Sequence, residues 1–166
     1  MEINDFKFKI ENDNVVITGY RGGEKEVVIP GNIDGRPVTV IGNFAFNNKF
    51  LTSVVIPNSV EKIGESAFRY NQLTDVIIPN SVKELNWAAF ANNSLTSITI
   101  PDSVEKIDDH VFSYNGLTSV TIPESVKEIG GFAFHNNKLT SVVIPNSVES
   151  IGEFAFDDDV KIKKAL

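Results

Sequence analysis

Histidine and aspartate side chains in this 166-residue sequence are the first groups that could bind a metal ion or move a proton. His110 directly follows Asp108 and Asp109, which would suit a site of imidazole and carboxylate ligands. Zinc, however, needs three or four converging protein ligands, and the one other histidine is His135. A solvated turn at His110 is therefore the favoured interpretation, and we expect no metal site.

Three consecutive aspartates at 157–159 are the second group with possible chemistry. Calcium loops of the EF-hand type alternate their oxygen ligands and place a glycine at the sharp turn. The stretch "DDDVKIKK" has neither feature. A charged terminal turn is the better interpretation, with calcium-dependent adhesion as an alternative.

Nucleophiles are the third group. Serine is plentiful, but none lies in a GxSxG elbow, and "GYRGGEK" near Tyr20 lacks the spacing and the following helix of a phosphate-binding loop. Cysteine is absent, which excludes thiol catalysis and disulfides. We therefore expect no enzymatic activity, no catalytic residues and no cofactor.

Net charge narrows the class of partner. The formal charge of −7 would repel phosphate backbones, so nucleic acid is not an expected partner. No apolar run approaches the roughly 20 residues that cross a bilayer, so we expect no membrane insertion. The opening "MEINDFKFK" lacks the basic region and apolar core of a signal peptide.

A 22-residue repeat must supply the elements that position any binding group. The stretch "LTSVVIPNSVEKIGESAF" starts at Leu51 and returns, lightly changed, at Leu73, Leu95, Leu117 and Leu139. Self-similarity at a fixed period in this range indicates a solenoid, in which each copy forms one coil and buries its apolar side chains against its neighbours.

Each copy predicts a short strand that ends at a proline. Val54 and Ile56 stand two residues apart, as in a strand with one buried face, and Pro57 has no N–H to donate to a ladder. An extended segment continues through "SVEKI". A single helical turn is expected around "ESAFR", because Gly64 excludes a longer helix.

Recurring polar residues support stacked coils. The charged pair after each buried valine inverts its sign from copy to copy, which would align one alternating column: Glu61, Lys83, Glu105, Lys127 and Glu149. Asparagine also recurs, at Asn71, Asn93, Asn115 and Asn137. We expect such columns to satisfy backbone groups of the adjacent coil rather than to do chemistry.

The chain is expected to form a single folded domain in which the repeats are flanked by a different sequence at each end. Residues 1–26, with "FKFKI" and "VVITGY" around "ENDN", predict a capping β-hairpin that covers the first coil. Residues 27–50 are a degenerate first repeat with the extra loop "GNIDGRP", and 51–160 are five 22-residue repeats. Residues 161–166 are expected to be a C-terminal tail.

The repeat resembles the BspA-like leucine-rich repeats of bacterial surface proteins over residues 27–158. The residues that carry the resemblance in the first close copy are Leu51, Val54, Ile56, Pro57, Val60, Ile63, Gly64, Ala67 and Phe68. The resemblance implies an α/β-type leucine-rich repeat solenoid that is mostly β. Short parallel strands would stack into a concave sheet, with short helical turns opposite. It further implies a place on the cell surface or in the secreted fraction, and the binding of other proteins.

Strand alternation predicts which side chains face outward on the concave sheet. They are Ser53, Val55, Asp75, Ile77, Ser97, Thr99, Ser119, Thr121, Ser141 and Val143. We expect a monomeric chain that binds a protein partner through this face. The alternative is a structural spacer or self-associating segment of a larger surface protein.

Aromatic residues also gather around the "AF" turn, at Phe44, Tyr70, Trp87, Tyr114, Phe132 and Phe154. They would suit interaction anchors. Packing over the coil edge is the favoured interpretation.

Overall fold

The N-terminal end is a β-hairpin preceded by one turn of 3₁₀ helix in the computed structural model, which describes residues 2–165. Helix η1 spans Ile3–Asp5, and β1 (Phe6–Glu11) pairs antiparallel with β2 (Asn14–Tyr20). Asn12 and Asp13 have φ of 49° and 63°, the backbone of a type I′ turn, which matches the twist of a hairpin. The predicted hairpin cap is confirmed.

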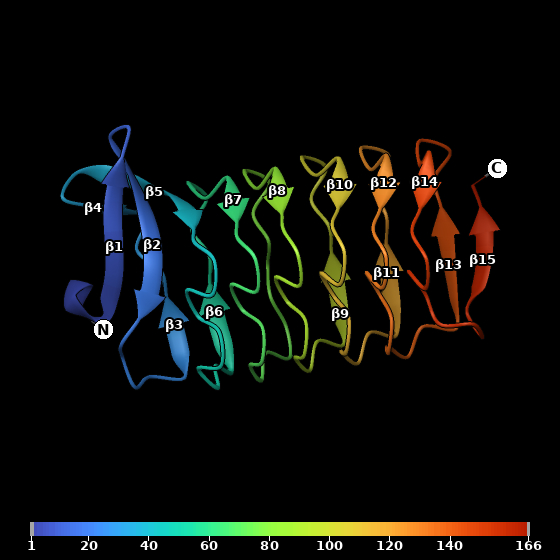
Figure 1. The fold of residues 1–166 in the computed structure, drawn as a ribbon, viewed down its shortest axis with the longest axis horizontal. Coiled ribbons are helices and arrows are strands. Elements are labelled where there is room, and N and C mark those ends of the chain that lie inside the picture. The colour runs from blue at the N-terminus through green and yellow to red at the C-terminus, as the bar shows by residue number, and fades with distance from the viewer. Residues whose placement is uncertain (1, 166) are drawn as a thin grey trace.

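The hairpin leads into a nine-stranded sheet that runs the length of the molecule (Figure 1). Strand β2 pairs in parallel with β5 (Arg36–Ile41), and β4 (Asn32–Ile33) folds back on β5 through the "GNIDGRP" loop. The later strands are the "EKI" segments of the repeats and are all parallel: β7 (Lys62–Ile63), β8 (Glu84–Leu85), β10 (Lys106–Ile107), β12 (Glu128–Ile129) and β14 (Ser150–Ile151).

A second row of strands contains segments that precede a proline, together with the "KIKK" segment near the C-terminus. Its parallel pairs are β3 (Glu26–Val28) with β6 (Ser53–Val55), β9 (Ser97–Thr99) with β11 (Ser119–Thr121), and β13 (Ser141–Ile144) with β15 (Lys161–Lys164). The segment 75–77 keeps the same alternation of burial but has no strand pairing. The tail expected at 161–166 is wrong for 161–164, because Ile162 continues the apolar column of Val142 and brings β15 alongside β13.

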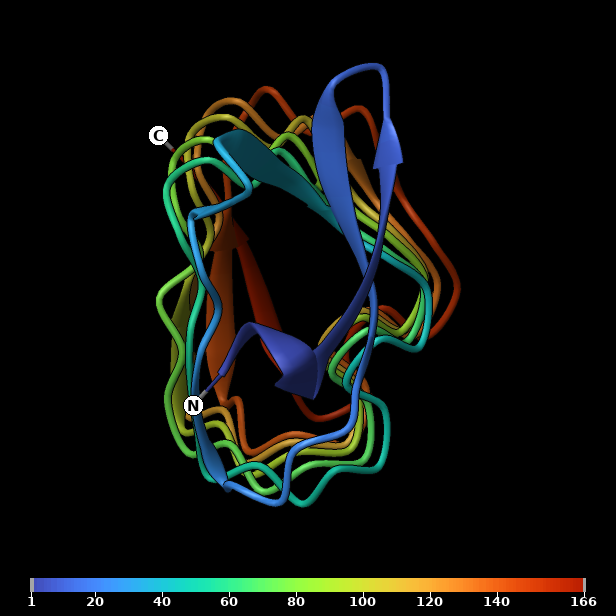
Figure 2. The same ribbon diagram turned by 90° about the vertical axis from the view of Figure 1, so that its left-hand side faces the viewer.

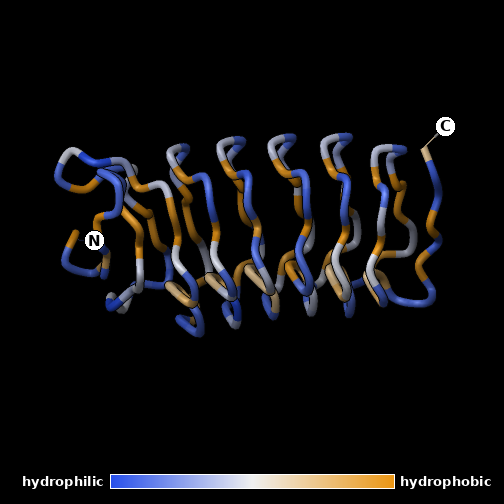
Figure 3. Tube along the Cα trace, turned by 45° about the horizontal axis from the view of Figure 1, so that its top comes forward, coloured by the Kyte–Doolittle hydropathy of each residue, from blue (hydrophilic) through white to orange (hydrophobic). Residues whose placement is uncertain are grey.

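Apolar columns fill the interior between the two rows. Figure 3 shows hydrophobic stretches at the same place in successive coils, and Figure 2 shows the coils superposed in one outline behind the hairpin. The rings of Phe46, Phe68, Phe90, Phe112, Phe134 and Phe156 stack with centroids 5.1–5.9 Å apart. Because this spacing is close to the strand distance of about 4.8 Å, each ring can lie on its predecessor without shifting the ladder.

The helical turn expected at "ESAFR" also differs from the prediction. Ser66 has a φ of 50°, in the left-handed region, and the equivalent residue of every other coil from Phe44 to Phe154 does too. Ser66 N–H and Phe68 N–H donate to Trp87 O and Ala89 O of the next coil, both at 2.8 Å. Bonds between coils therefore replace the bonds of a helix, and the mostly β, parallel-strand solenoid is confirmed.

The asparagine side chains form hydrogen bonds to backbone groups of neighbouring coils, as predicted. Asn71 Nδ2 donates to Phe46 O and Phe68 O, and its Oδ1 accepts the N–H of Leu51, all at 2.9 Å. The same three contacts recur at Asn93, Asn115 and Asn137. One amide thus satisfies two carbonyls and one N–H of the turn, which explains why the column is invariant in these repeats.

The charged column forms ion pairs two coils at a time. Lys83 Nζ lies 2.9 Å from Glu61, and Lys127 Nζ lies 3.4 Å from Glu105. Within residues 2–165 no such pair joins Lys83 to Glu105. The inverted signs thus align the coils as predicted, but as separate pairs rather than one continuous column.

Candidate binding surfaces

The ten residues predicted to face outward on the strands are all exposed, and we call them the strand face. Their inward neighbours, such as Val54 and Ile98, are buried. Strand pairing sets Ser97 beside Ser119 and Thr99 beside Thr121, so the hydroxyls form rows across coils. The structure therefore gathers the predicted residues on one continuous surface, where Ile77 is the most exposed of the apolar members at 80%.

Few of these side chains serve the fold. The neighbouring serine column bonds to the preceding coil, for example Ser81 Oγ to Val60 O at 2.6 Å. In the part of the chain that the structure describes, no such hydrogen bond involves a side chain of the strand face. Its hydroxyls and the carboxylate of Asp75 are free to meet another molecule.

The chemistry of this surface changes along the solenoid. Strand pairing sets Val28 beside Val55, which extends an apolar row toward the N-terminal end, with Glu26 on the same strand. At the other end Lys161 and Lys163 lie beside Ser141 and Val143. Sequence reasoning missed these four added residues, although "EVVIP" at 26–30 matches "SVVIP" at 53–57 and signalled the first two.

A shallow pocket lies at the C-terminal half of the strand face. Its volume is about 390 Å³, and its lining includes Thr121, Ser141, Val143 and Ala165. It combines hydroxyl groups with apolar walls, a lining that suits a side chain of a partner.

A second exposed strip lies along the turn edge, where most of the aromatic residues pack on one another as predicted. The rings of His110 and Phe132 stack with centroids 4.8 Å apart and an interplanar angle of 1°. The centroids of Phe132 and Phe154 are 5.2 Å apart, and Trp87 meets His110 edge-on with centroids 5.9 Å apart. His110 lies in a turn, as expected, but its ring is half-buried between aromatic neighbours rather than fully solvated. Burial lowers the pKa of His110, and the nearby Arg69 adds to that effect.

His135 and Asp157 meet farther along the same edge, with His135 Nδ1 2.8 Å from Asp157 Oδ1. Asp157 also accepts the backbone N–H groups of Asn136 and Asn137, at 2.9 and 3.2 Å. Its carboxylate therefore closes the last turn. Within residues 2–165 no three histidine, aspartate or glutamate side chains are placed to hold a metal ion.

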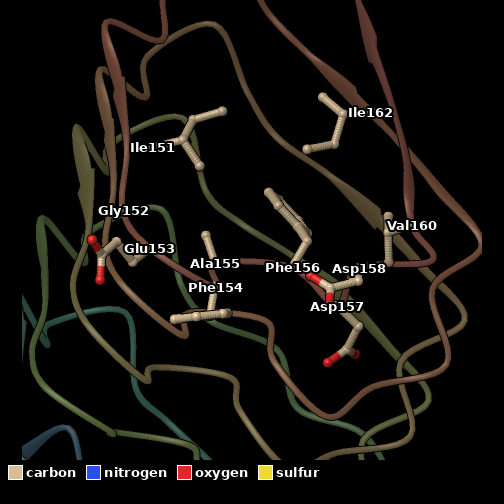
Figure 4. A pocket seen from close by; sticks show the side chains of 10 residues that line it. All are labelled: Ile151, Gly152, Glu153, Phe154, Ala155, Phe156, Asp157, Asp158, Val160 and Ile162. Carbon is tan, nitrogen blue, oxygen red and sulfur yellow. The ribbon is translucent and has the colours of Figure 1, made fainter.

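The third candidate surface is the C-terminal end of the solenoid. A cavity of about 520 Å³ opens there, and Figure 4 shows Ile151, Phe156, Val160 and Ile162 around it. Ile151 and Ile162 are 42% and 53% exposed.

Across residues 2–165, no helix has the length and apolar character needed to span a bilayer.

Comparisons with known proteins agree with this architecture. The family model described as "BspA type Leucine rich repeat region" matches residues 39–163 in six copies. Among curated proteins none matches the chain.

Several solved structures are similar. The Treponema pallidum leucine-rich repeat protein is 28% identical with a TM-score of 0.76, over 98% of this chain and 85% of that one. A leucine-rich cell surface protein from Faecalibacterium prausnitzii is 28% identical with a TM-score of 0.73, and its match covers 99% of this chain but only 54% of its own. A leucine-rich repeat protein from Bacteroides capillosus is 33% identical with a TM-score of 0.62, over 72% of this chain and 95% of that one.

The repeat columns, the stacked strands and the family match over residues 39–163 lead to one conclusion. The chain belongs to the BspA-type leucine-rich repeat family.

Proposed function

We propose that this chain is a non-enzymatic module that binds another protein through the strand face, at the surface of a bacterium or after secretion. The observation that carries the proposal is a regular, exposed array of side chains to which the fold assigns no task. A scaffold that repeats its buried columns while leaving one face free is well suited to recognition, because the free face can change without cost to stability.

The composition of the strand face favours a protein partner. Serine and threonine hydroxyls offer hydrogen bonds, Val55, Ile77 and Val143 offer apolar contact, and the net charge of −7 opposes nucleic acid. The surface location is supported by the Faecalibacterium prausnitzii neighbour, which is described as a leucine-rich cell surface protein.

Beads coated with the chain and applied to epithelial cells test this proposal. The variants Thr99→Arg and Thr121→Arg each add a long cation to the middle of the strand face. We expect each to lower bead adhesion about tenfold, the effect of losing about 1.4 kcal/mol. Protease treatment of the cells should abolish adhesion, because the partner is a protein.

Thr18→Arg is the matched control, since Thr18 is an exposed threonine on β2, in the other row of strands. Adhesion should survive that change. Equal adhesion of all three variants and the parent would reject the strand face as the contact surface.

A second candidate function is self-association as a spacer in a larger surface protein. The exposed Ile151 and Ile162 at the C-terminal end favour it, because an apolar end is a ready contact for another coil. Sedimentation velocity over a range of concentrations separates the two functions. A chain that stays monomeric at the highest concentration rejects end-to-end assembly.

A further inference from the structure

The turn edge carries a cluster whose composition differs from the rest of the surface. Arg69, Tyr70 and Trp87 lie together on neighbouring coils, and we call them with Tyr114 the arginine–aromatic cluster. The Arg69 guanidinium lies over the ring of Tyr70 at 4.6 Å and over that of Trp87 at 5.3 Å. Arginine, tyrosine and tryptophan are the residue types that contribute most to binding energy at protein interfaces.

The guanidinium of Arg69 is held rigidly but is not neutralised. Its Nε donates to Asn92 Oδ1 at 3.2 Å, and one Nη donates to Tyr70 Oη at 3.1 Å. No ion pair within residues 2–165 includes Arg69. Asp109, one coil beyond Trp87, has its Oδ1 engaged with Gly131 N–H at 2.7 Å. Of the five guanidinium donors, three therefore remain for an external anion such as a carboxylate.

The backbone under the two tyrosines provides an independent observation. Tyr70 and Tyr114 have φ of 57° and 55°, and the same position of the coils between and beside them is Asn48, Asn92 and Asn136. Asparagine tolerates this left-handed backbone, whereas a bulky ring is strained there. Tyr70 and Tyr114 are 48% and 49% exposed, so about half of each side chain remains open to a partner.

From this geometry we infer that the arginine–aromatic cluster is a second binding site, which takes an acidic segment of a partner protein. A glutamate or aspartate carboxylate pairs with the free donors of Arg69, and apolar side chains beside it rest on Trp87 and between the two tyrosines. The tyrosines lie two coils apart, about 10 Å, which is the length of three extended residues. Stacking fixes the guanidinium before binding, so little entropy is lost when the anion arrives.

Trp87 allows a direct test, because it is the one tryptophan of the chain and is 37% exposed. The probe is the acetylated and amidated peptide Leu-Glu-Leu-Glu-Leu, added while tryptophan fluorescence is followed. We expect a saturable change, and an affinity about tenfold lower for the same peptide with glutamine in place of glutamate. Added salt should lower the affinity for the acidic peptide and leave the affinity for the glutamine peptide unchanged.

Variants separate recognition from folding. Arg69→Gln should lower the affinity for the acidic peptide about tenfold or more. Arg21→Gln, which changes an exposed arginine at the N-terminal end, should leave it unchanged. Tyr70→Asn and Tyr114→Asn should weaken binding while the melting temperature stays the same or rises, because asparagine relieves the left-handed strain.

Three outcomes overturn the inference. The first is the absence of a saturable response at about 1 mM peptide, a concentration that detects even weak binding. The second is equal affinity of Arg69→Gln and the parent. The third is tighter binding of sialyllactose than of the peptide, which would identify the cluster as a site for acidic glycans. Loss of adhesion in the strand-face variants is a separate result, since Thr99 and Thr121 lie on β9 and β11, whereas the cluster lies on the turn edge.

Discussion

The two ends of the solenoid meet solvent in different ways. At the N-terminal end the hairpin lies across the first coil (Figure 2), and the rings of Phe6 and Tyr20 pack on Phe46 at 6.3 and 5.6 Å. At the C-terminal end the columns of Ile63 and Val142 reach Ile151 and Ile162, which are substantially exposed. The repeat therefore stabilises its neighbours but cannot close itself, and an end needs a sequence that departs from the repeat.

Charge contributes to closure where apolar packing does not. Strand β15 reads "KIKK", and Lys164 takes the register position that Ile144 fills with a buried side chain one coil earlier. Lysine on an edge strand discourages pairing with another chain. Strand β14, the last of the nine-stranded sheet, has no such lysine. Lysines therefore protect the edge strand of one row, whereas the edge strand of the other row has no such protection.

The largest expected effect comes from one charge placed at two points of the same column. Ile63→Lys puts an unpaired ammonium where the side chain is fully buried, and we expect a loss of several kcal/mol and no cooperative folding. Ile151→Lys, at the open end, should change the free energy of unfolding by about 0.5 kcal/mol or less. Urea denaturation followed by circular dichroism measures both. A large loss at Ile151 would mean that this end is closed in solution.

Ring removal is the next test. Phe46→Ala removes a ring that touches the cap and the next coil together, and we expect a loss of about 3–5 kcal/mol. Phe156→Ala should cost about 3 kcal/mol or less, because among residues 2–165 its ring stacks only on Phe134. Thermal unfolding gives the order of the two variants. Equal losses would show that the open end is packed as tightly as the capped one.

The asparagine column gives a smaller contrast. Asn71→Ala leaves Phe46 O, Phe68 O and Leu51 N without their partner, and we expect a loss of about 2–3 kcal/mol. Asp159 stands at the next place of the column after Asn137 but is exposed. Asp159→Ala is the control and should have no measurable effect on the urea midpoint. A substantial loss of stability in Asp159→Ala would show that Asp159 makes equivalent hydrogen bonds in the last turn.

Sequence periodicity was sufficient to predict the stacked strands and the outward set of ten residues, because a buried column must repeat wherever coils stack. The hairpin followed from two alternating runs around turn residues. Periodicity failed at the "ESAFR" turn. Residues such as Ser66 and Phe132 have no glycine-like signature, so their left-handed backbone was hidden until the bonds between coils were visible. It also failed at β15, where Ile162 is one apolar residue among lysines.

Of the candidate sites, one could be predicted from the periodicity of the sequence and one could not. The strand face follows from alternation, which is a property of the repeat. The arginine–aromatic cluster does not, because Arg69 and Trp87 each occur in one coil and meet only through stacking. Unique residues on a repeating scaffold are located by the register of the coils, and periodicity carries no information about their contacts.

The smallest expected effect tests whether β14 holds its register at the open end. The pairing of β12 with β14 sets Ser150 beside Glu128, at the point where the alternation of charge stops. Ser150→Lys would continue the alternation and should stabilise the chain by about 0.2–1 kcal/mol, whereas Ser150→Glu should destabilise it by a similar amount. Both effects should shrink at high salt, because the side chains are exposed. Thermal melts at two salt concentrations measure them. If β14 frays, residue 150 leaves the reach of Glu128, and both variants will melt with the parent at either salt concentration.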